Sequence, residues 1–266
     1  MDGGEASNES SSRNQLENRT EEQDELKKKL IEYDDFTWKL SSSMEPPQGS
    51  EMLKYVGGVD MSFSKEDSSV ACACLVVLEL PSLRVVHHEF SLLRLHVPYV
   101  PGFLAFREAP VLLQILQKMR DDKHPFYPQV LMVDGNGILH PRGFGLACHL
   151  GVLAQLPTIG VGKNLHHVDG LNQSEVRRSL QLKENEHEQV ITLGFRPTLS
   201  SIKPIYISVG HRISLESAVE IVKMTCKYRV PEPIRQADIK SRAYLQKHQT
   251  EPSKRIWTAT TGQTEP

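Results

Sequence analysis

Three acidic residues occupy positions where the chain should be burying apolar side chains. Asp60 ends the apolar run VGGVD, and Asp134 ends the apolar run VLMVD. A carboxylate at the end of a buried strand lies at the rim of a sheet, where α/β proteins bind their ligands. Glu108 follows Phe103 and Phe106 in a segment of helical periodicity, and burying its charge is costly unless a cation or a metal ion compensates it.

Carboxylates on neighbouring elements repel one another, and they persist together where a divalent cation neutralises them. Oxygen-only ligation suits Mg²⁺ or Mn²⁺ rather than zinc. Such a cation, completed by water and phosphate oxygens, is the apparatus of phosphodiester cleavage. Asp238, in RQADIK, is a candidate fourth member. The alternative is that Asp60 and Asp134 cap turns and Glu108 pairs with Arg107 or another cation, because structural ion pairs imitate active sites.

A glycine-rich segment, VDGNGILHPRGFG, includes Asp134 and continues beyond it. Its glycines can bring the backbone close to a ligand, so that amide and carbonyl groups reach the edge of a base, while His140 and Arg142 could reach phosphates. Lys163 leaves the strand TIGVG at the same edge and could contact a substrate oxygen. The segment lacks a phosphate-binding nucleotide motif, so a nucleotide cofactor is not indicated. The alternatives are that the glycine-rich segment only connects a strand to a helix and that Lys163 is an exposed lysine without a role in the site.

The cysteines do not favour a different chemistry. Cys72, Cys74, Cys148 and Cys226 include no C-x-x-C pair, so a zinc ribbon is not indicated and buried free thiols are expected. Cys148 and His149 are adjacent, but consecutive helical residues do not face each other, and no nucleophile-elbow pattern surrounds them.

The bulk composition fits one large domain with polar ends. The chain has 266 residues, of which 39% are hydrophobic and 24% charged. No apolar run is long enough to span a membrane, and the acidic, serine-rich beginning is not a signal peptide. Residues 1–50 carry 12 acidic and 6 basic residues, and the remainder carries 21 and 25. The chain after residue 50 is thus mildly basic, which is compatible with a polyanionic partner.

The chain divides into four segments. We expect residues 1–20 to be disordered and residues 21–50 to form a helix and a linker. We expect a domain over 51–244 that carries the candidate catalytic residues, followed by a polar tail over 245–266. Its expected elements are strands at 54–63, 70–80 and 84–95; a helix at 102–120 that kinks or breaks at Pro110; a strand at 129–135; a helix at 143–154; a strand at 157–163; a weak helix within 171–190; strands at ITLGF and KPIYISVG; and a helix at 215–229 capped by Ser214.

Three antiparallel strands followed by alternating helices and strands predict an α/β fold. Helices should cover a mixed sheet, and the order is that of a ribonuclease H-like core.

Five motifs resemble the endonuclease V family, nucleases that recognise deaminated adenine as inosine or deoxyinosine. They are VGGVDMSF, PYVPGFLAFRE, VDGNGILHPRGFGLACHLGV, IGVGK and YISVGHRISLESAV, and they cover roughly 55–240. The resemblance implies a ribonuclease H-like fold and hydrolysis that depends on Mg²⁺, with Mn²⁺ as a substitute. It also implies cutting at the second phosphodiester bond 3′ to the lesion, which leaves 3′-hydroxyl and 5′-phosphate ends.

The resemblance also assigns roles by motif position. Asp60, Glu108 and Asp134 match the metal-binding carboxylates, and Lys163 matches a catalytic lysine. Asp238 matches a position near the active site whose residue type varies. Tyr99 matches a strand-separating wedge, and its flanking prolines restrict the backbone. By motif position, the residues assigned to substrate binding are Pro98, Tyr99, Val100, Pro101, Gly102, Leu104, Gly135, Gly137 and Gly145, and His140 of the glycine-rich segment is added to them.

Bacterial members of the family act chiefly on DNA, whereas eukaryotic members resemble ribonucleases for inosine-containing single-stranded RNA. The long polar extensions look eukaryotic, so the favoured substrate is RNA, which proteins read on unpaired bases. The alternatives are a DNA repair endonuclease cutting 3′ to deoxyinosine and a non-catalytic binder of inosine-containing RNA. We expect a monomer in the cytoplasm and nucleus, including the nucleolus, that is neither secreted nor membrane-bound.

One segment departs from the family pattern. Residues 185–205 are shorter and more divergent than the family's counterpart, as a splice variant or a rearranged edge strand would be. The three carboxylates lie upstream of it, so metal binding should survive.

Overall fold

The computed structural model describes residues 3–40, 51–95, 97, 100–164, 194–195, 203–248 and 257–258. Their elements are α1 (Gly3–Lys27), β1 (Tyr55–Phe63), β2 (Val70–Glu79), β3 (Arg84–Arg94), α2 (Ala105–Asp121), β4 (Val130–Asp134), α3 (Leu146–Ala154), β5 (Thr158–Gly162), β6 (Gly194–Phe195), β7 (Ile205–His211), α5 (Leu215–Thr225), α6 (Glu232–His248) and β8 (Trp257–Thr258).

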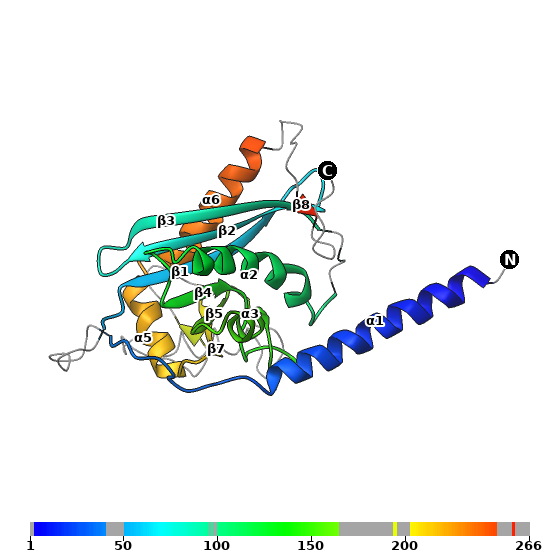
Figure 1. Cartoon of the computed structure of the whole chain (residues 1–266), viewed down its shortest axis with the longest axis horizontal. Coiled ribbons are helices and arrows are strands. Elements are labelled where there is room, and N and C mark those ends of the chain that lie inside the picture. The colour runs from blue at the N-terminus through cyan, green and yellow to red at the C-terminus, as the bar shows by residue number, and fades with distance from the viewer. Residues whose placement is uncertain are drawn as a thin grey trace.

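One mixed sheet organises these elements, with the strand order β6-β7-β5-β4-β1-β2-β3-β8 (Figure 1). β1, β2 and β3 form the predicted antiparallel meander, and β4 and β5 continue the sheet in parallel from β1. Helices α2 and α3 cover one face, while α5 and α6 pack on the other (Figure 1). The expected α/β, ribonuclease H-like fold with helices flanking a mixed sheet is confirmed.

The core explains why β2 reads as an almost continuous apolar run. Residues 71–78 are fully buried because both faces of the strand are covered. One apolar cluster joins β2 to α2 and α3, and another joins β4, β5 and β7 to α5. Across the part of the chain that the structure describes, no helix has the length and apolarity needed to cross a membrane.

The N-terminal segment of the structure differs from the expectation in two respects. Residues 3–20, expected to be disordered, belong to α1, and the helix expected within 21–50 ends at Lys27. Figure 1 shows α1 extending away from the body, with its C-terminal end alongside α3. Leu26 and Leu30 were expected on the apolar side of a helix here, and both pack into one cluster, whereas the buried Gln23 had no apolar signal. Residues after the helix extend along the body, where Trp38 is buried and stacks on Phe36 at 3.6 Å.

The C-terminal end also differs from the expectation. The tail expected over 245–266 begins inside α6, which buries Leu245, and β8 pairs with β3. α2 does not break at Pro110, which is exposed in its second turn. Ser214 does cap α5, accepting a hydrogen bond from the Ser217 amide. The weak helix predicted within 171–190 lies outside the described residues, as does most of 185–205.

α6 packs directly on β1, close to Asp60. The Oγ atoms of Ser62 and Ser241 lie 2.7 Å apart in a buried hydrogen bond. A Cβ atom on Gly58 would lie 2.2 Å from the carbonyl carbon of Pro233, at the start of α6. The helix therefore approaches the strand closely because Gly58 has no side chain.

Gly58→Ala should destabilise the protein by about 3 kcal/mol, because the methyl group meets backbone that cannot rotate away. Gly57→Ala is the matched control on the other face of β1, since its methyl group would meet the side-chain ends of Leu131 and Pro128. Urea denaturation of both variants measures the difference. Equal losses would show that the approach of α6 does not require glycine at 58.

His149 is a buried titratable group in α3. Its ring packs against Phe106 and Phe144, with centroid separations of 4.9 and 5.9 Å. Burial lowers the pKa of His149 from 6.5 to about 4. The folded state therefore resists protonation that the unfolded state accepts.

Acidification should therefore weaken the fold through His149. The unfolded chain gains a proton as the pH falls below 6.5, whereas the folded chain gains it only near pH 4. Between pH 7 and pH 5, the unfolding free energy of the wild type should fall by about 2 kcal/mol relative to His149→Leu. Denaturant titrations at the two pH values test this. A constant difference between wild type and variant would contradict it.

Candidate active site

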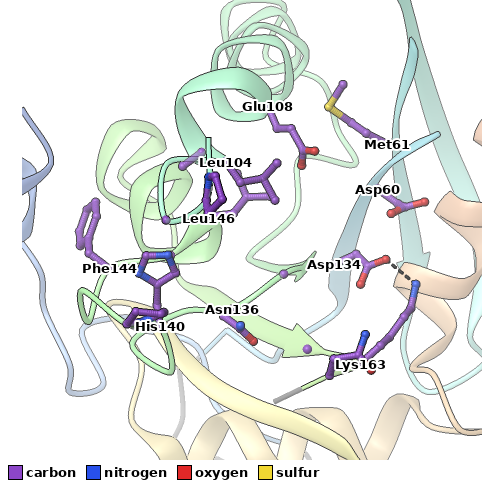
Figure 2. A pocket seen from close by; sticks show the side chains of 18 residues that line it. Asp60, Met61, Leu104, Glu108, Asp134, Asn136, His140, Phe144, Leu146 and Lys163 are labelled. Atoms are coloured by element: carbon purple, nitrogen blue, oxygen red, sulfur yellow. Dashed lines mark hydrogen bonds and ion pairs between the residues drawn. The ribbon is translucent and has the colours of Figure 1, made fainter. Parts of the chain in front are cut away.

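Two carboxylates lie side by side because of the sheet register. β1 and β4 are parallel, and Val59 pairs with Val133, so that Asp60 and Asp134 occupy neighbouring positions one residue further on. Lys163 follows β5, the next strand of the sheet, and its Nζ atom lies 2.5 Å from Oδ2 of Asp134. Figure 2 shows the three side chains pointing toward one another. The structure thus brings together three residues from separate motifs.

The electrostatics of this group are those of crowded negative charge. Burial, followed by the neighbouring Asp134 carboxylate, raises the pKa of Asp60 well above its ordinary value. Burial lowers the pKa of Lys163, but Asp134, Asp60 and Asp238 outweigh it and leave that pKa raised. Lys163 therefore stays protonated, and one lysine only partly offsets the carboxylates that face it.

Glu108 reaches the same cavity from α2 (Figure 2). Its residue is 8% exposed, and burial raises the pKa of its carboxyl to about 7, against the opposing charge of Arg107. Arg107 donates to the carbonyl oxygen of Ser68 and lies over the ring of Phe63. Among the described residues, no hydrogen bond or ion pair reaches the Glu108 carboxylate. The alternative of a Glu108–Arg107 ion pair is therefore not what these residues form.

The donor set suits a hard divalent cation. No three acidic, histidine or cysteine side chains converge into a complete metal site within the residues that the structure describes. Mg²⁺, however, commonly takes one or two carboxylates and completes its shell with water and substrate phosphate. Asp60 and Asp134, adjacent and incompletely neutralised, fit that pattern, with Glu108 available in the same cavity.

The first of two cavities that meet at these carboxylates is about 560 Å³ in volume. It contains six of the predicted substrate-binding residues: Pro101, Gly102, Leu104, Gly135, His140 and Gly145. Val100 and Gly137 do not line it. Pro98 and Tyr99, including the predicted wedge, lie outside the described residues.

The same cavity contains residues that the sequence analysis missed. Asn136 lines it, and the buried Oδ1 atom of this side chain has no hydrogen-bond partner among the residues described. Phe144 and Leu146 add apolar surface. Asn136 had a signal, since it lies between two glycines directly after a strand-end aspartate. The apolar residues had none, because they read as ordinary core.

Gly137 serves packing rather than the cavity. A Cβ atom there would lie 1.9 Å from the carbonyl oxygen of Val209 on β7. Its amide donates to Oγ of Ser208 at 2.8 Å. Arg142, offered as a phosphate contact, is likewise engaged elsewhere, with Gln23 and Asp24 of α1.

The second cavity, about 540 Å³, extends from the carboxylates toward α6. Asp238 and Arg242 line it and form an ion pair at 2.6 Å, and Lys65 also lines it. Asp238 is close enough to Asp60 to help raise its pKa. The structure therefore places the candidate fourth acidic residue in a cavity with Asp60 and Asp134, and outside the cavity that Glu108 lines.

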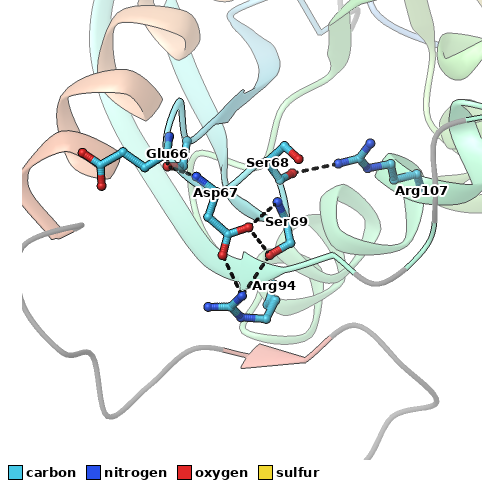
Figure 3. A network of polar contacts seen from close by, with 7 residues as sticks. Glu66, Asp67, Ser68, Ser69, Arg94 and Arg107 are labelled. Atoms are coloured by element: carbon cyan, nitrogen blue, oxygen red, sulfur yellow. Dashed lines mark hydrogen bonds and ion pairs between the residues drawn. The ribbon is translucent and has the colours of Figure 1, made fainter.

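A polar network fixes the β1–β2 turn that carries Lys65 (Figure 3). Asp67 accepts hydrogen bonds from the amide and hydroxyl of Ser69 and from Arg94, the last at 2.7 Å. Arg107, next to Glu108, donates to the Ser68 carbonyl at 3.2 Å. The turn at the rim of the second cavity is thus tied to both β3 and α2.

Comparison with known proteins agrees with this geometry. The family model described as Endonuclease V matches residues 36–239. Human Endonuclease V is 46% identical over 236 residues, which cover 85% of this chain and 82% of the human protein. Mouse Endonuclease V is also 46% identical over 236 residues, covering 85% of this chain and 68% of the mouse protein.

Solved structures point the same way. The catalytic domain of human Endonuclease V matches with a TM-score of 0.80 and 43% identity, covering 90% of this chain and 99% of the human one. Endonuclease V of Ciona intestinalis, in complex with a 24mer DNA containing an inosine followed by a ribo-adenosine, matches with a TM-score of 0.78 and 38% identity, covering 88% and 99%. With the fold, the register of its carboxylates and these matches in agreement, the chain belongs to the Endonuclease V family.

Proposed function

We propose that this protein is a Mg²⁺-dependent endonuclease that hydrolyses the second phosphodiester bond 3′ to inosine in single-stranded RNA. The products are a 3′-hydroxyl and a 5′-phosphate. The observation that carries the proposal is the meeting of two cavities at Asp60, Asp134 and Lys163. One cavity can take a base while the other takes the adjoining backbone, which puts a phosphodiester bond beside the carboxylates.

The first cavity has the character of a base-binding pocket. Gly102, Gly135 and Gly145 present backbone, and Leu104 and Leu146 present apolar surface. A base that leaves its stack is read by hydrogen bonds to its edge and by contact with its faces. The side-chain amide of Asn136, which lines the cavity, can supply one such hydrogen bond. Tyr99, proposed from its motif, would lie beside the displaced base.

The cleavage chemistry falls to the residues where the cavities meet. Asp60 and Asp134 would hold the metal ion, assisted by Glu108, and a bound Mg²⁺ supplies an activated water and offsets charge on the leaving oxygen. Lys163 remains protonated beside Asp134, so its ammonium group can hydrogen-bond an oxygen of the scissile phosphate. Asp238 holds Arg242 at the rim of the second cavity, where the guanidinium group can meet a neighbouring phosphate.

The family context supports inosine as the base. The Ciona intestinalis relative crystallised with DNA in which a ribo-adenosine follows the inosine. The sugar at that position is therefore the natural place to test for a 2′-hydroxyl effect.

Asp60→Asn should abolish cutting of an inosine-containing RNA oligomer, lowering kcat/KM at least about a thousandfold, because it removes a metal-binding charge. Binding of the oligomer should change far less. Asp121→Asn, at the exposed end of α2 and outside both cavities, is the matched control. Gel-resolved cleavage in Mg²⁺ or Mn²⁺ provides the measurement. Wild-type cutting that persists in EDTA would refute the metal mechanism.

Matched oligomers should separate RNA from DNA as the substrate. We expect inosine-containing RNA to be cut at least about tenfold faster than deoxyinosine-containing DNA, as loss of one hydrogen bond to a 2′-hydroxyl would produce. A DNA oligomer with one ribonucleotide directly 3′ to deoxyinosine should recover most of the rate. Faster cutting of all-DNA substrate would favour the DNA repair endonuclease. Tight binding without cutting in Mn²⁺ would favour the non-catalytic binder.

A further inference from the structure

We propose that Gln23 of α1 is a positioning residue that sets the width of the base cavity. This inference rests on the proposed function, because it assigns the cavity to a base. Gln23 lies ahead of residues 36–239, the part of the chain that the family model matches. It also lies outside the lining of both cavities, so it would act through other residues.

The side-chain amide of Gln23 bridges two walls of the cavity. Its Nε2 atom donates to the carbonyl oxygen of Phe144 at 2.9 Å and to that of Gly102 at 3.3 Å. Phe144 and Gly102 both line the cavity, one just before α3 and the other just before α2. Two segments 42 positions apart in the chain are thus joined by one donor group. Gln23 is 1% exposed, so water does not compete for these bonds.

The acceptor end of the same amide is also engaged. Oε1 of Gln23 accepts a hydrogen bond from Nε of Arg142 at 2.5 Å, and Nη2 of Arg142 contacts Asp24 at 2.8 Å. Lys27, one turn further along α1, donates to the carbonyl oxygen of Arg142 at 2.8 Å. These contacts fix the orientation of the amide, because its NH₂ group must then face the cavity walls.

Apolar packing holds α1 at the height where Gln23 can reach both walls. Leu26 packs with Phe144, Cys148 and Val152 in a small buried cluster. The helix is thereby tied to α3 on the side away from the sheet (Figure 1). Leu26 and Gln23 are three residues apart and share one face of α1.

The bridged segments need such a restraint. Gly102 has a φ of 81°, and a Cβ atom there would meet nothing within 4 Å, so its surroundings are open. The Gly102 and Phe144 segments belong to loops rather than to the sheet, and loops open more readily than strands. α2, which follows the first loop, carries Glu108 into the same cavity. Loosening the bridge should therefore change how the base sits more than how the metal ion binds.

Gln23→Leu removes both donors while keeping a side chain of similar size. Hydrogen exchange of peptides covering 100–104 and 137–146 should accelerate about tenfold, as expected for the loss of buried hydrogen bonds, while exchange in β1 and β4 should not change. KM for the inosine-containing RNA oligomer should rise about tenfold, with kcat and the Mn²⁺ requirement nearly unchanged. Gln15→Leu, two turns earlier on the exposed part of α1, is the matched control.

Gln23→Glu provides a second test that keeps the size and the acceptor for Arg142. Its carboxylate faces two carbonyl oxygens without donating to them, so it should behave like Gln23→Leu. Gln23→Asn, which retains the amide on a shorter stem, should recover part of the protection and part of the KM effect. Unchanged exchange in both loops, a fall in kcat without a rise in KM, or equal effects from Gln15→Leu would overturn the proposal.

The exchange experiment needs no substrate, so its result stands apart from the proposed function. If the wild type failed to cut any inosine-containing oligomer, the proposed function would fail while accelerated exchange would still demonstrate the bridge. If the wild type cut normally and Gln23→Leu matched it in both exchange and KM, only the bridge would fail.

Discussion

The structure depends on holding two like charges next to each other inside a sheet. Asp60 and Asp134 are neighbours because parallel strands β1 and β4 pair in register up to the residues just before them. Desolvation and mutual repulsion both disfavour two ionised carboxylates at that spacing. Burial of the surrounding apolar clusters offsets the electrostatic cost of this pair, and Lys163 relieves only part of that cost. Such a pair of carboxylates retains affinity for a cation because Lys163 neutralises only part of its negative charge.

α6 turns this pair into a larger site. Gly58 and Ser62 lie on either side of Asp60 along β1 and point to the same face, and both contact α6. The helix therefore packs beside Asp60, and Asp238 lines a cavity together with it. On the other side, α2 delivers Glu108 into the cavity that Asp60 also lines. Four acidic residues thus come from two helices and two strands, and Asp60 of β1 lines both cavities.

The parts of the site that could be predicted from sequence are those that local patterns encode. Asp60 and Asp134 end short apolar strands, and the meander and the cap at Ser214 follow from alternation and turn chemistry. α6 was missed because its buried residues, including Ile234, Ala237 and Leu245, are sparse among polar ones. Gly137 looked like a ligand-binding glycine, yet its constraint is the backbone of β7, more than seventy residues away in the chain. Such contacts leave no periodic trace.

Gln23 is the clearest case of a long-range contact that the sequence does not reveal. A glutamine in a polar helix carries no sequence signal, yet its amide joins two loop residues that lie 79 and 121 positions later in the chain. Buried side-chain amides are costly unless all their groups are bonded, so a fully bonded one restrains every element that it touches. The carboxylate pair is fixed by strand register, which is rigid, whereas the base cavity is enclosed largely by loops. The sheet does not fix the separation of those loops, so a contact from outside the sheet is needed to define it, and α1 contributes that contact.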